Sequence, residues 1–68
     1  MKLSARNQLK GTVTGVTTGA VMAEVVVDVG GQEVVAAITR GSVDSLALAA
    51  GDDVTVVIKA TEVILAKD

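Results

Sequence analysis

A cluster of hydrogen-bond donors lies close to the N-terminus of this chain. Residues 4–8, Ser-Ala-Arg-Asn-Gln, combine a hydroxyl, a guanidinium and two side-chain amides. The guanidinium presents its N–H donors in a planar fork, and serine and asparagine side chains donate as well, so the segment is suited to bind an oxyanion. The alternative interpretation is a frayed polar N-terminus that binds nothing.

A second polar segment, residues 59–62, follows an apolar run and consists of Lys-Ala-Thr-Glu. It places a cation and a hydroxyl beside a small alanine, although a solvated turn is the alternative. Cations are scarce, because only six lysine and arginine residues occur in the whole chain. Donors without bulk suit a small tetrahedral anion that accepts several hydrogen bonds, with apolar walls setting the size of its cavity.

A third polar segment, residues 39–42, precedes a stretch with helical periodicity. Because backbone N–H groups at the start of a helix favour an anion, a weaker second anion site is expected at Thr39, Arg40, Gly41 and Ser42. Ser42 as a plain N-cap residue is the alternative. The three polar segments do not by themselves indicate which anion is bound.

The composition argues against catalysis and against a metal ion held directly by side chains. The chain contains neither cysteine nor histidine, so it lacks the thiolate nucleophile, the imidazole base and the usual zinc ligands. Its eight carboxylates are spread along the sequence, and only Asp52 and Asp53 are adjacent, where a solvated turn is expected. We therefore expect a protein that is not an enzyme.

The composition also limits the classes of partner. A net charge of -2 and the absence of aromatic residues disfavour nucleic acid, because single-strand binders use positive charge and stacking rings. The apolar runs are far shorter than the roughly 20 residues that cross a bilayer, so no membrane partner is expected. Arg6 and Asn7 interrupt the apolar stretch that a signal peptide needs, which favours a cytoplasmic location.

Apolar and polar residues alternate through most of the chain, which is typical of β-strands. The alternation predicts a first strand over 9–17, with Val13 and Gly15 on one face and Val16 on the other. After a short turn, it predicts a second strand over 20–29 whose odd-numbered residues share one face.

A glycine pair separates the second strand from the third. Gly30 and Gly31 tolerate positive φ and predict a two-residue hairpin that pairs the second strand with a strand over 32–39. Both faces of 34–38 are apolar, so one face is expected in the core and the other against a neighbouring subunit.

The apolar spacing becomes helical between residues 41 and 50. Spacing of i, i+3, i+4 and i+7 predicts a short helix whose buried face is formed by Val43, Leu46, Ala47 and Ala50. Ser42 is expected to be its N-cap, and Gly51 is expected to follow its C-terminus.

Alternation returns over 52–59, and residues 63–66 are expected to form a last strand. Three strands, a helix and two strands predict an all-β fold, a five-stranded OB-type barrel with one short helix between strands 3 and 4. An SH3-like barrel is the alternative, but a helix between the third and fourth strands favours the OB type. Closure would remove most of the free sheet edges.

The chain is short for a stable monomer. A single domain over residues 1–68 would bury only about 60% of its unfolded surface. Small domains usually gain stability from disulfides, a metal or oligomerisation. This chain contains neither cysteine nor histidine, so it can form no disulfide and lacks the usual metal ligands. Oligomerisation is therefore expected.

Three stretches resemble a known family: 4–11 (Ser-Ala-Arg-Asn-Gln-Leu-Lys-Gly), 23–25 (Ala-Glu-Val) and 57–63 (Val-Ile-Lys-Ala-Thr-Glu-Val). They are similar to the molbindins, small cytoplasmic molybdate-binding proteins made of the Mop repeat, also called the TOBE domain. The resemblance covers nearly the whole chain. It implies an OB-type fold, no catalytic activity, no organic cofactor and binding of molybdate or tungstate at subunit interfaces. A single repeat implies a homohexamer, described as a trimer of dimers.

The resemblance also implies which residues bind the anion. Carried over to this sequence, the site takes Ser4, Arg6 and Asn7 from one subunit. It takes Lys59, Ala60 and Thr61 from another. Storage or homeostasis of molybdate is the expected role. The alternatives are a ligand-sensing regulatory module of a molybdate transport or transcription system, and a purely structural oligomeric adaptor.

Overall fold

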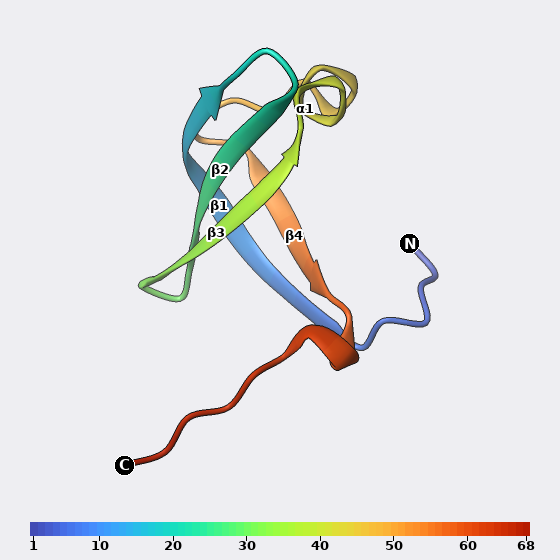
Figure 1. Ribbon diagram of the computed structural model, residues 1–68, viewed down its shortest axis with the longest axis vertical. Helices are drawn as coiled ribbons and strands as arrows, with labels where there is room; N and C mark the ends of the chain where they lie inside the picture. Colours follow the sequence, from blue (N-terminus) through green and yellow to red (C-terminus); the bar gives the residue numbers. More distant parts are fainter.

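The computed structural model describes all 68 residues and shows an antiparallel sheet with one short helix (Figure 1). The strands and helices are β1 (Asn7–Thr18), β2 (Met22–Val29), β3 (Gln32–Thr39), α1 (Arg40–Leu46), β4 (Asp53–Ile58) and the 3₁₀ turn η1 (Ala60–Glu62). The strand order in the sheet is β3-β2-β1-β4. The all-β class and the helix between the third and fourth strands are confirmed.

The prediction of a fifth strand and a closed barrel was wrong for this chain. The sheet has four strands, so β3 and β4 each keep a free edge. After η1 the chain runs away from the sheet, and residues 63–66 therefore have no strand edge beside them (Figure 1). Ile64 and Leu65 are 92% and 89% exposed. An apolar run gives a segment the capacity to form a strand, but a strand also needs a partner.

The core consists of five buried residues, of which four lie in the sheet and one in α1: Val13, Ala23, Val25, Val27 and Val43. The odd-numbered residues of β2 face inward as predicted. In β1, however, the register with β2 shifts between Val13 and Gly15. Thr14 is thus the extra residue of a β-bulge, and the bulge turns Val16 toward the core. The predicted placement of Val16 on the face opposite Val13 was wrong for this reason.

The β2–β3 hairpin forms where the glycine pair predicts it. Gly30 and Gly31 adopt φ values of 58° and 88°, which residues with a Cβ atom rarely adopt. Val29 and Gln32 are the flanking pair of the ladder. The hairpin prediction is confirmed.

The helix is shorter than predicted, and both of its caps differ. Thr39, not Ser42, is the N-cap, because its Oγ1 accepts the Ser42 N–H at 3.1 Å. The helix ends at Leu46 because Ala47 takes the left-handed conformation (φ 51°), several residues before Gly51. This bend leaves Leu46 67% exposed and brings Leu48 against the core in its place. Of the residues that were predicted to form the buried face of the helix, only Val43 is therefore buried.

Much apolar surface remains exposed. Only five of the 68 residues are buried, and several large apolar side chains lie on the surface, among them Val21, Val35, Leu46, Ile64 and Leu65. No helix of the protein has the length and apolar character needed to span a membrane.

Candidate anion-binding site

The first and second polar segments lie at the same end of the sheet. Asn7 and Ile58 are the terminal pair of the antiparallel β1–β4 ladder, so residues 4–6 and 59–61 extend from neighbouring strand ends (Figure 1). The side chain of Asn7 strengthens this junction, because its Nδ2 donates to the Ile58 carbonyl at 3.2 Å. A single chain therefore brings together the two sets of residues that were expected from two different subunits.

The second polar segment forms the turn η1 and offers backbone donors. Lys59 precedes the turn with extended φ and ψ, and no side chain caps it. The Glu62 N–H donates to the Lys59 carbonyl at 2.9 Å, whereas the N–H groups at the start of such a turn have no partner within it. The N–H groups of Ala60 and Thr61 are in this position, and both residues are exposed. They are suited to an anion.

The charged and hydroxyl side chains of the two segments are free. Ser4, Arg6, Lys59 and Thr61 are exposed, and none of the side-chain hydrogen bonds in the chain involves them. Asn7 is half-buried and uses one amide hydrogen on Ile58, which leaves a second hydrogen for another acceptor. Together these side chains present two cations and two hydroxyls without internal partners, and one free amide hydrogen of Asn7.

Gln8 contributes a contact that the sequence pattern did not single out. Its Nε2 donates to the Ala5 carbonyl at 2.7 Å, across three residues. The bond ties the start of β1 back to Ala5 and so spans Arg6. A glutamine this far into the chain always follows a backbone carbonyl by three residues, so the sequence carried no specific signal for this bond.

The third polar segment lies at the opposite end of the sheet, beside α1 (Figure 1). Its hydroxyl groups bond to one another, because Thr39 Oγ1 and Ser42 Oγ are 2.8 Å apart. Arg40 Nη1 donates to the Gly19 carbonyl at 3.5 Å. Hydrogen bonds of residues 39–42 thus cap the helix and hold the β1–β2 turn, and these residues lie apart from the candidate site at residues 4–7 and 59–61.

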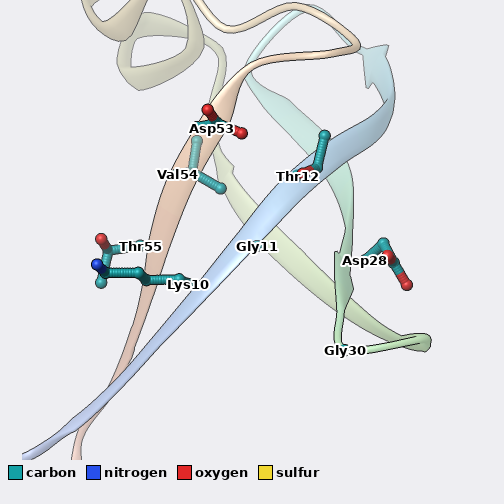
Figure 2. A pocket seen from close by; sticks show the side chains of 8 residues that line it. All are labelled: Lys10, Gly11, Thr12, Asp28, Gly30, Asp53, Val54 and Thr55. Carbon is teal, nitrogen blue, oxygen red and sulfur yellow. The ribbon is translucent and has the colours of Figure 1, made fainter.

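A polar cavity of about 580 Å³ lies elsewhere, on the outer face of the sheet (Figure 2). Its lining includes Lys10, but also the carboxylates of Asp28 and Asp53, which repel an anion. Figure 2 shows Asp28 on the other side of β1 from Lys10. The chain has no group of three or more carboxylate, histidine or cysteine side chains that could hold a metal ion. The cavity is therefore a poor candidate for either kind of ion.

Comparisons with known proteins agree with the resemblance of the two polar segments. Residues 3–65 match the TOBE domain family. Molybdenum-pterin-binding protein 1 of Clostridium pasteurianum is 44% identical over 66 residues, which are 96% of this chain and 97% of that protein.

Two solved structures extend the comparison to the fold. A molybdate-binding protein from Sporomusa ovata has a TM-score of 0.95 and 51% identity, and the match covers 98% of this chain and all (100%) of that one. The cytoplasmic molybdate-binding protein ModG, solved with molybdate bound, has a TM-score of 0.84 and 51% identity over 88% of this chain and 43% of its own. The chain therefore belongs to the TOBE domain family, to which its resemblance to the molbindins pointed.

Proposed function

We propose that this protein is a non-catalytic binding protein for molybdate, and for the similar tungstate ion. The observation that carries the proposal is the Asn7–Ile58 pair, which places the two donor-rich segments side by side. The names of the relatives support the choice of anion, since they are a molybdenum-pterin-binding protein and two molybdate-binding proteins.

The donors of the site match a tetrahedral dianion. Arg6 and Lys59 supply positive charge, while the hydroxyls of Ser4 and Thr61 and the free amide hydrogen of Asn7 donate neutral hydrogen bonds. The uncapped turn η1 adds the backbone N–H groups of Ala60 and Thr61. No step in this binding requires an organic cofactor, and the chain has no aromatic ring on which one could stack.

The binding unit is proposed to be a homohexamer, a trimer of dimers, in which each subunit is a single domain over residues 1–68. Support comes from the apolar side chains that one subunit leaves in water, such as Val35 at 58% and Leu46 at 67% exposure. Exposed apolar surface and free strand edges are typical of protein interfaces. Because the two segments lie at the same end of each subunit, two such ends that meet within the hexamer bring residues 4–7 of one subunit to residues 59–61 of another, so the anion joins subunits.

The proposed role is cytoplasmic storage or homeostasis of the anion, by reversible capture. ModG, which is described as cytoplasmic, supports the location. Residues 39–42 remain a weaker proposal for a second class of anion site, because their N–H and hydroxyl groups are donors but are engaged within the chain.

Native mass spectrometry tests the proposal directly. The protein is titrated with sodium molybdate and, separately, with sodium sulfate. We expect a hexamer that takes up several molybdate ions and few sulfate ions, which also gives the stoichiometry. A monomer would contradict the assembly, and an oligomer that ignores molybdate would contradict the function and favour a structural adaptor.

A further inference from the structure

Gln8 and Asn7 are consecutive amides at the start of β1, and their side chains point to opposite faces of the sheet. Asn7 Nδ2 donates to the carbonyl of Ile58, directly before the second polar segment. Gln8 Nε2 donates to the carbonyl of Ala5, within the first polar segment. Gln8 therefore fixes the backbone of the first segment, and Asn7 fixes the strand residue that precedes the second.

The bond made by Gln8 has no substitute in the chain. Residues 1–6 precede the first strand, and no backbone hydrogen bond outside the helices and strands involves them. Among the side-chain hydrogen bonds, only the one from Gln8 reaches this segment, at 2.7 Å. Without it, residues 1–6 are joined to the sheet by the covalent chain and by side-chain packing alone.

We propose that Gln8 is a positioning residue, which orders the segment that carries Ser4 and Arg6 before the anion arrives. The inference rests on the proposed function. A free segment must lose conformational entropy when it closes on a ligand, and a segment that is already ordered loses less. Gln8 thus raises the affinity for the anion without touching it.

The variant Gln8→Met tests this role, because methionine has a similar length but no N–H donor. The matched control is Gln32→Met. Gln32 is also an exposed glutamine in a strand, and it lies at the β2–β3 hairpin. Its side chain makes no hydrogen bond. We expect the Kd for sodium molybdate, measured by calorimetry on the full chain, to rise about three- to tenfold in Gln8→Met. It should stay within twofold or so in the control.

Backbone ¹⁵N relaxation of the protein without molybdate distinguishes a positioning role of Gln8 from a merely structural one. The order parameters of Ala5 and Arg6 should fall below about 0.6 in Gln8→Met and remain higher in the wild type and in Gln32→Met. The melting temperature of the ligand-free protein should be the same for all three, because the bond lies outside the core.

The outcomes separate this inference from the proposed function. An unchanged Kd in Gln8→Met overturns the role of Gln8 while wild-type uptake of molybdate still supports the function. A weaker affinity with unchanged order parameters also overturns it, since Gln8 would then contact the anion. If the wild type takes up no molybdate, both proposals fail.

Discussion

The two ends of the sheet carry similar residues but use them differently. At the helix end, Thr39, Arg40 and Ser42 form hydrogen bonds within the chain that cap α1 and hold the β1–β2 turn. At the other end, Arg6 and Lys59 have no internal hydrogen-bond partner, and the turn η1 has no side-chain cap. A hydroxyl or a cation is available to a ligand only when the fold does not already use it. The comparison therefore favours the proposal that one end binds the anion, while the hydrogen bonds at the other end stabilise the fold.

The largest expected effect is stabilisation of the whole protein by the anion. A ligand that binds only the folded state stabilises it by RT ln(1 + [L]/Kd), about 2.7 kcal/mol at a hundredfold excess over Kd. For a chain of this size, that corresponds to a rise in melting temperature of roughly 10 to 20 °C. Differential scanning calorimetry at fixed protein concentration measures it.

Sulfate at the same concentration is the control for that experiment. We expect a much smaller shift, because the site is proposed to fit the larger molybdate ion. Equal shifts with the two anions would refute the selectivity and point to a general effect of ionic strength on a chain with few cations.

Removal of charge at the binding end should have the next largest effect. Arg6→Ala and Lys59→Ala are each expected to weaken molybdate binding tenfold or more, about 1.4 kcal/mol, because each removes a cation from the anion. Arg40→Ala is the matched control, since Arg40 is a cation at the helix end. Calorimetric titration gives the three Kd values, and an equal loss in Arg40→Ala would break the distinction between the two ends.

The same two variants decide whether the site lies within one chain or between two. If residues 4–7 of one subunit meet residues 59–61 of another, hexamers refolded from a mixture of Arg6→Ala and Lys59→Ala contain some intact sites. About a quarter of the sites would then bind with wild-type affinity, as for random pairing of two halves. A mixture with no tight site would place both halves of each site in one chain.

The alternation of residues predicted the first four strands well because it depends on neighbours in the sequence, whereas the strand expected over residues 63–66 has no partner in the sheet. The hairpin at Gly30 and Gly31 was predictable for the same reason, since positive φ is a local property of glycine. The bulge at Thr14 was not, because a bulge is a mismatch in register between two strands and only their pairing reveals it. The left-handed Ala47, which ends α1 early, likewise has no signal in an alanine-rich stretch.

The residues of the proposed site stand out in the sequence as types but not as a constellation. Their donors indicate an oxyanion site, and the resemblance to the molbindins joined the two segments. That Asn7 pairs with Ile58, 51 positions away, depends on which strands are neighbours in the sheet. The bond from Gln8 depends on one rotamer of an exposed side chain, which no pattern of residue types specifies.

The smallest effect concerns the helix end, where Thr39→Ala should change stability but not binding. The variant removes the oxygen that accepts the Ser42 N–H at 3.1 Å, and loss of such a cap costs about 1 kcal/mol, or roughly 4 to 8 °C in melting temperature. Thr39→Ser keeps the hydroxyl and should lose much less. Calorimetric titration should give an unchanged molybdate Kd and an unchanged number of ions per oligomer in both variants. If Thr39→Ala instead lost a class of bound ions that Thr39→Ser retained, residues 39–42 would be the second anion site, and the helix end would bind as well as stabilise.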